Sequence, residues 1–164
     1  MNKVFYAAAL LFLFGCLPRQ HSRDLKAKVN ELEKTVADLK PGLGDIMGVI
    51  QQHHAKLYFS GVAQNWVLAQ YQLDEIQEGL DDAVKYYPRF KNVVAPLTEL
   101  IPSMTKSSLE GVARAIERKS KTEFVRAFNS LSVSCTNCHI SANHPFIKIQ
   151  TPRQPMFTNQ KFEL

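Results

Sequence analysis

The chain has 164 residues, enough for one globular domain with short additions but not for two domains of ordinary size. Hydrophobic residues make up 45% of it, a share typical of soluble globular proteins and too high for a disordered chain. The formal net charge is +5, yet no run of five or six basic residues occurs, so the composition does not indicate a nucleic-acid-binding protein.

The N-terminal segment predicts export from the cytoplasm. The apolar run at 4–14 is too short to span a bilayer and has the length of a signal-peptide core. Cys16 follows a glycine at the end of this run, which resembles the cleavage box of bacterial lipoproteins. We therefore expect residues 1–15 to be a lipoprotein signal peptide and Cys16 to carry lipid. The alternatives are an ordinary signal peptide and an uncleaved N-terminal anchor.

The residue after Cys16 indicates which of the two bacterial membranes would hold the lipid anchor. Leu17, and not aspartate, stands at this position. In lipoproteins of this type that favours the outer membrane, so we expect a cell-envelope protein that is lipid-anchored there and faces the periplasm.

Residues 16–44 are expected to form the anchor, a spacer and a helical stalk. Apolar residues recur in heptads, with valine at a and leucine at d, a pattern typical of parallel two-stranded coiled coils. The heptad residues are Leu25, Val29, Leu32, Val36 and Leu39. Lys28 at g and Glu33 at the following e would attract each other across a homodimer. The pattern is shorter than a sustained coiled coil needs, so a single amphipathic helix lying on the domain is the alternative.

The pattern at 45–144 predicts one helical domain, and its first half contains two amphipathic segments. Ile46, Ile50, His53 and Leu57 share one helical face, and a turn at 60–65, around Gly61, is expected to follow. Apolar residues then recur at threes and fours from Trp66 to Tyr87, and Pro88 ends this segment.

The second half of the domain contains two capping boxes. The apolar stretch at 93–101 is cut by prolines, so we expect a short or kinked piece there. Ser107 with Glu110, and Ser120 with Glu123, predict the beginnings of two helices. No segment alternates with period two, so the predicted fold class is all-α: a four-helix bundle with an N-terminal coiled-coil-like helix.

The tail at 145–164 is rich in both proline and large apolar residues. Proline at this density prevents a helix, and the apolar residues disfavour free disorder. We expect an extended C-terminal strap that packs over the bundle.

The sequence C-T-N-C-H, from Cys135 to His139, predicts one covalently bound haem. Two cysteines at this spacing can reach the two vinyl groups on one edge of a haem, and the histidine supplies the proximal iron ligand. A thioredoxin-like dithiol would need a βαβ surround, which is absent. A zinc site formed with His144, or a buried structural pair of cysteines, are the remaining alternatives. Export argues against free thiols, because they oxidise outside the cytosol.

The phase of the last helix also indicates a buried cofactor. The attachment cysteines continue an apolar stripe with spacings of four, three, four and three. The stripe consists of Phe124, Phe128, Leu131, Cys135 and Cys138. A haem attached there would point into the core of the bundle.

A signal peptide, a helical bundle and a single C-T-N-C-H in the last helix resemble the class II c-type cytochromes, the cytochrome c prime group. The resemblance covers roughly residues 45–143 and implies haem thioethers at Cys135 and Cys138, with His139 as proximal ligand. In that family the first bundle helix passes the distal face of the haem. Here this helix carries His53 and His54, with Met47 nearby.

The two histidines lie equally far from the centre of the apolar stripe, on opposite sides, so periodicity does not choose between His53 and His54 as distal ligand. Both could equally be polar residues on the helix flank. Met104 and Met156 are weaker candidates, for which packing is the simpler role.

The function that follows is that of a periplasm-facing monohaem cytochrome, which passes single electrons to a redox partner protein. The first alternative is a haem-based protein that binds or senses nitric oxide or carbon monoxide, and the second is a structural coiled-coil lipoprotein. No nucleophile–base motif, paired carboxylates or phosphate loop occurs, so the sequence does not predict an enzyme.

Overall fold

The computed structural model describes residues 17–163, except for 92 and 156. The predicted signal peptide, Cys16 and Met156 lie outside the described residues. The contacts within the chain divide it into two units, which separate between Lys40 and Pro41. We describe each unit by itself.

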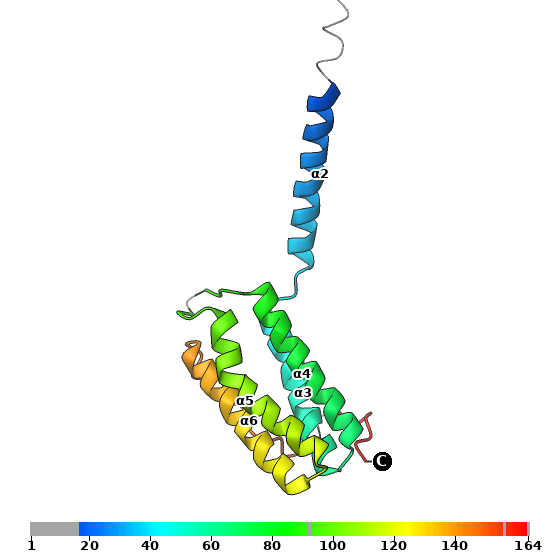
Figure 1. The fold of residues 1–164 in the computed structure, drawn as a ribbon, viewed down its shortest axis with the longest axis vertical. Helices are drawn as coiled ribbons and strands as arrows, with labels where there is room; N and C mark the ends of the chain where they lie inside the picture. Colours follow the sequence, from blue (N-terminus) through cyan, green and yellow to red (C-terminus); the bar gives the residue numbers. More distant parts are fainter. Residues whose placement is uncertain (1–16, 92, 156, 164) are drawn as a thin grey trace, which may run out of the picture. The chain divides into compact units, whose positions relative to one another are not determined.

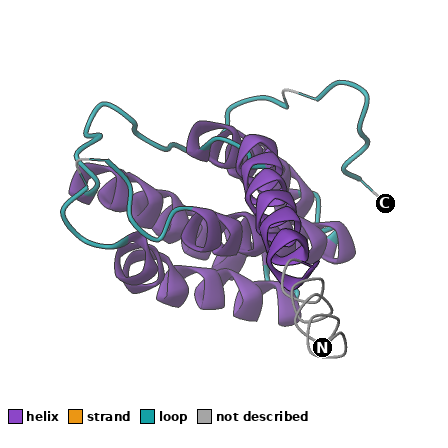
Figure 2. Cartoon of the chain, turned by 90° about the horizontal axis from the view of Figure 1, so that it is seen from above, coloured by secondary structure: helices purple, strands orange, loops and turns teal. Residues whose placement is uncertain are grey.

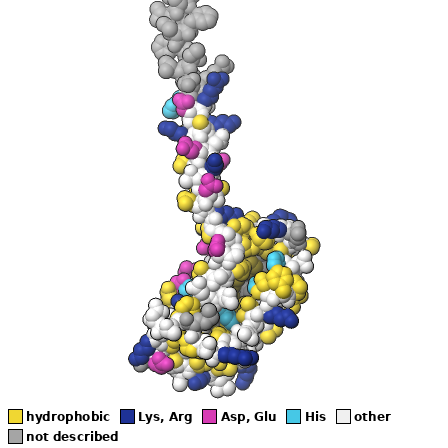
Figure 3. Space-filling model, turned by 180° about the vertical axis from the view of Figure 1, so that it is seen from behind, with side chains coloured by type: hydrophobic (Ala, Val, Ile, Leu, Met, Phe, Trp, Pro, Cys, Tyr) yellow, Lys and Arg dark blue, Asp and Glu magenta, His cyan; other side chains and the backbone are white. Residues whose placement is uncertain are grey.

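The first unit contains one described helix, α2, which spans Leu17–Leu39 (Figure 1). It starts upstream of the predicted heptads and ends with the last of them. The five heptad residues are all exposed, from 43% for Val29 to 78% for Leu39. In Figure 3 the hydrophobic side chains of this helix lie open at its surface, between charged ones.

The second unit is a bundle of four helices (Figure 1). They are α3 (Leu43–Val62), α4 (Trp66–Tyr86), α5 (Leu97–Glu117) and α6 (Lys121–Ser141). Each helix packs on the next, and α3 also packs on α6, which closes the ring. The described residues contain helices and loops but no strand (Figure 2). The predicted all-α class and the helical bundle are therefore confirmed.

The core is made of the inward stripes of all four helices. Burial of such apolar area is the main favourable term in folding, at about 25 cal/mol for each Å² removed from water. The largest fully buried apolar side chains are Phe124, Phe128, Leu57, Ile76, Leu131 and Val112.

The helix boundaries follow some of the predicted signals and not others. Ser120 caps α6, and its hydroxyl accepts a hydrogen bond from the backbone N–H of Glu123 at 3.3 Å. The prediction of a helix start at Ser107 is wrong, because α5 begins after Pro96 and already includes Ser107. Pro102 lies inside α5 without ending it. Leu100 and Ile101 are buried in the core, and their packing offsets the backbone hydrogen bond that proline removes.

The turn predicted at 60–65 lies in the second half of this range, because α3 continues through Gly61 to Val62. The chain reverses at residues 63–65, where Gln64 has a φ of 59°. Gly61 is needed for a different reason. A Cβ built on it would lie 2.1 Å from ring carbons of Phe124, so the glycine lets α6 place this ring directly against α3.

Replacing Gly61 with alanine is expected to destabilise the bundle by about 1–3 kcal/mol, the usual cost of an overpacked core. Gly48 is the matched control in the same helix, since a Cβ there meets nothing within 4 Å. Gly48→Ala should stabilise the protein by about 0.5–1 kcal/mol through helix propensity. Urea unfolding followed by circular dichroism measures both; equal midpoints for the two variants would contradict the close approach.

The predicted C-terminal strap follows α6 without helix and contacts the bundle at several points. The Thr151 hydroxyl donates to Asn129 Oδ1 at 2.7 Å, and Lys56 Nζ lies 4.5 Å from the centre of the Phe157 ring. Phe162 is 6% exposed, and its ring lies 5.6 Å from that of Phe59. These contacts agree with the expected packing of the tail over the bundle.

Among the described helices, none is both long enough and apolar enough to cross a membrane.

Candidate functional site

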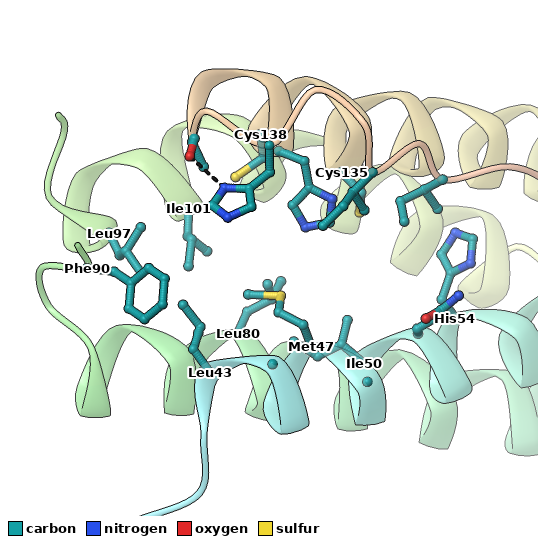
Figure 4. A pocket seen from close by; sticks show the side chains of 18 of the residues that line it. Leu43, Met47, Ile50, His54, Leu80, Phe90, Leu97, Ile101, Cys135 and Cys138 are labelled. Carbon is teal, nitrogen blue, oxygen red and sulfur yellow. Dashed lines mark hydrogen bonds between the residues drawn. The ribbon is translucent and has the colours of Figure 1, made fainter. Parts of the chain in front are cut away.

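A cavity of about 750 Å³ opens in the bundle between α3 and α6 (Figure 4). This volume lies within the range of about 300–1,000 Å³ that cofactor sites occupy. Most of its wall is apolar, and the residues labelled in Figure 4 show its composition. They are Leu43, Met47, Ile50, His54, Leu80, Phe90, Leu97, Ile101, Cys135 and Cys138.

Helix α6 brings the C-T-N-C-H residues to this cavity. Cys135, Cys138 and His139 all line it, as the phase of the apolar stripe predicts. Both cysteines are free thiols and point into the cavity in Figure 4. Burial, together with the neighbouring Cys138, raises the pKa of Cys135 to about 11. Burial also raises the pKa of Cys138, so both groups are neutral thiols at pH 7 in this apolar wall.

His139 has one ring nitrogen that is buried without a hydrogen-bond partner. Its Nδ1 atom is buried and has no hydrogen-bond partner, the single such side-chain atom among the described residues. Burial lowers the pKa of His139, the charge of His144 lowers it further, and the Ile147 backbone acts in the opposite direction through a hydrogen bond. A neutral imidazole with an unpaired nitrogen inside a cavity is a group that suits a metal centre.

His54 lies on the α3 side of the same cavity and is 5% exposed. Its Nε2 atom is 2.9 Å from Ser132 Oγ, and its ring centre is 4.4 Å from that of Phe128. Ser132 donates its one hydroxyl proton to the Phe128 carbonyl at 3.1 Å, so His54 Nε2 is the donor of the first bond. The lone pair of the neutral ring is then on Nδ1. Burial lowers the pKa of His54 to about 4.

His53 takes a different direction. Its Nδ1 atom lies 2.8 Å from Gln72 Oε1, and its Nε2 atom lies 3.6 Å from Glu75 Oε2, both on α4. It does not line the cavity. Of the two candidate distal histidines, the structure therefore brings only His54 to the cysteines' cavity.

Met47, which the sequence places near the two histidines, also lines the cavity. Met47 lies on α3, and its thioether points across the cavity toward the wall of Cys135 and Cys138 (Figure 4). Met104 packs against the core and does not line the cavity. Met47 belongs to the same stripe as Ile46 and Ile50, where an apolar residue is expected for packing alone, so its role is not visible in the sequence pattern.

The beginning of the C-terminal strap forms another wall of the cavity, from His144 to Ile149. Thr136, inside the C-T-N-C-H sequence, holds this wall. Its hydroxyl accepts a hydrogen bond from the Ile149 backbone N–H at 2.9 Å and lies 3.3 Å from the Ile149 carbonyl. His144 Nδ1 lies 2.7 Å from the Ala142 carbonyl, to which it can donate. The sequence suggested the strap but not this attachment.

Among the described residues, no group of three or more His, Cys, Asp or Glu side chains is arranged to hold a metal ion. A c-type haem differs from such a site, because it is held by two thioethers and needs one proximal histidine. The orphaned His139 nitrogen, the two thiols and the apolar cavity fit this group. No family model, curated protein or solved structure matches the chain.

Proposed function

We propose that the protein is a monohaem c-type cytochrome that transfers single electrons. One observation carries the proposal: two free thiols and a histidine with an orphaned buried nitrogen line one apolar cavity of about 750 Å³. Cys135 and Cys138 would bind the haem covalently, and His139 would be the proximal ligand. The resident haem iron would supply the redox chemistry, by alternating between two oxidation states.

The chain's own residues would set the environment of that iron. The apolar side chains of α3, α5 and α6 exclude water from the cavity, which reduces the reorganisation that accompanies electron transfer. Burial keeps His54 neutral at pH 7, so its Nδ1 lone pair is available as a distal ligand. Met47 offers a thioether on the same side. The signal-peptide pattern and Cys16 support a lipid-anchored position in the bacterial outer membrane, where a periplasmic redox protein would be the partner.

A second function is favoured by one specific contact. His54 is held by Ser132 at 2.9 Å and by the Phe128 ring, and both belong to α6. If these contacts persist in the holoprotein and hold Nδ1 away from the iron, His54 does not bind the iron. A distal side with no protein ligand would then bind a diatomic gas such as nitric oxide or carbon monoxide.

Covalent haem attachment is the first experimental test. We expect the exported protein to give the pyridine haemochrome spectrum of a c-type haem, and a mass increased by one haem. The Cys135→Ser, Cys138→Ser double variant should lose both signals. Thr136→Ser is the control within the same motif, since it keeps both cysteines and the hydroxyl. A wild-type chain that carries no added haem mass after export with haem-maturation proteins would overturn the proposal.

The spectrum of the reduced holoprotein separates the two functions. Sharp low-spin bands that do not respond to carbon monoxide are expected for an electron carrier with a distal protein ligand. High-spin bands that shift on adding carbon monoxide would favour the gas-binding function. Single variants His54→Ala and Met47→Ala then identify the ligand, because only the true ligand's loss converts low spin to high spin. His53→Ala is the matched control, as this side chain contacts α4 and not the cavity.

A further inference from the structure

Helix α2 has an apolar face with no partner inside its own unit. Its 23 residues form a separate unit with no second described helix to pack on. An isolated helix gains little stability from propensity alone, and most helices are stabilised by burying an apolar face. On α2 that face remains exposed, with Leu32 at 63% and Val36 at 68%.

The apolar residues of this face are arranged to suit a second helix as partner. Valine stands at both a positions and leucine at all three d positions of the repeat, which is the combination that favours two parallel strands. The seam is narrow and regular, as expected for a second helix and not for a broad protein surface. A second copy of the same helix satisfies it, because a layers then meet a layers and d layers meet d layers.

The charges beside the seam fit the parallel orientation that the valine and leucine positions favour. In a parallel pair, Lys28 at g of one copy faces Glu33 at e of the other, and symmetry produces this contact twice. In an antiparallel pair, e positions face e positions and g positions face g positions, so Lys28 and Glu33 would not face each other. Only the parallel pair therefore brings these two residues together.

We propose that α2 is the homodimerisation element of this protein and forms a parallel two-stranded coiled coil through Leu25, Val29, Leu32, Val36 and Leu39. The dimer would present two bundles on one stalk. This interface does not depend on haem, so it stands or falls separately from the proposed function.

Charge exchange on the full-length chain tests both the dimer and its orientation. Lys28→Glu alone and Glu33→Lys alone each create two like-charge contacts in a parallel homodimer. We expect each variant to associate about tenfold more weakly than the wild type, from the loss of two attractive pairs and the gain of two repulsive ones. An equal mixture of the two variants restores opposite charges in both contacts and should recover wild-type association. Lys34→Glu is the control, since position f faces away from the seam.

Sedimentation velocity over a concentration series in detergent provides the measurement, and circular dichroism checks that each variant keeps its helices. The proposal requires a wild-type dimer, weakened single variants and a restored mixture. A wild type that is monomeric throughout the series would overturn it. Variants that associate like the wild type, or a mixture no stronger than its components, would overturn the parallel arrangement.

Discussion

Replacing Phe128 with alanine is expected to destabilise the bundle by about 3–5 kcal/mol, the usual range for truncating a buried phenylalanine. Phe128 is fully buried in α6. Its ring centre lies 4.4 Å from that of His54, 5.0 Å from Tyr58 and 6.1 Å from Phe124. The substitution therefore removes the contact between two helices as well as apolar area. It also releases one side of the His54 ring.

Phe146 is the matched control for this substitution. It lies in the strap with 77% of its surface exposed, so Phe146→Ala should change the stability by less than about 0.5 kcal/mol. Chemical unfolding curves of both variants provide the free energies. A loss below about 1 kcal/mol in Phe128→Ala would mean that this ring is not the central α3–α6 contact.

Lowering the pH from 7 to 4 is expected to reduce the free energy of unfolding of the haem-free protein by about 3 kcal/mol through His54 alone. The pKa of His54 is lowered from 6.5 in the unfolded chain to about 4 in the folded one, because burial disfavours the charged ring. The unfolded chain therefore takes up a proton at a higher pH than the folded chain does. The stabilising contribution is complete above pH 6.5, falls as the pH drops, and is lost by about pH 4.

Two variants separate the contribution of His54 from that of carboxylates, which are protonated over a similar pH range. His54→Gln keeps an amide that can bond Ser132, and His54→Leu does not, but neither residue titrates. Both variants should lose less stability than the wild type between pH 7 and pH 4, by the same amount, despite different absolute stabilities. Free energies of unfolding measured at several pH values give the comparison. Parallel curves for wild type and variants would show that His54 is not buried as described.

The last helix was the most predictable part of the bundle. The spacing of Phe124, Phe128 and Leu131 fixes one face of a helix, and that face is fully buried in the structure. The same phase predicts that Cys135 and Cys138 point inward, where they line the cavity. The local sequence pattern is sufficient to predict this buried face, because the same few apolar residues show both the helical period and the side that is buried.

The ends of the helices and the contacts between them were less predictable, because they depend on residues far apart in the sequence. Ser107 and Glu110 have the spacing of a capping box, but this spacing also fits one turn inside a helix, as in α5. Gly61 resembled a turn residue, although it serves as the contact point for the Phe124 ring. Phe124, a residue 63 positions away, decides its role, and no local window contains that information.

The choice between His53 and His54 shows the same limit at the candidate site. The two lie symmetrically about the stripe of α3, so the sequence leaves them equivalent. The distinction arises from which helix packs on each flank: α4 offers Gln72 and Glu75 to His53, whereas α6 offers Ser132 and Phe128 to His54. Met47 was noted only as a neighbour of the two histidines, because a methionine on an apolar stripe resembles ordinary packing.

The attachment of the strap to Thr136 has a consequence for the order in which the molecule is assembled. The chain is made from its N-terminus, so α3 and α6 are complete before residues 144–151 emerge. During that interval the cavity lacks one wall, and its cysteines are accessible from that side. Two hydrogen bonds later close this wall, one between Thr136 and Ile149 and one between Asn129 and Thr151, and neither is fully buried. The cavity is therefore open on the side of the strap while the four helices are already complete, and the last segment of the same chain closes it.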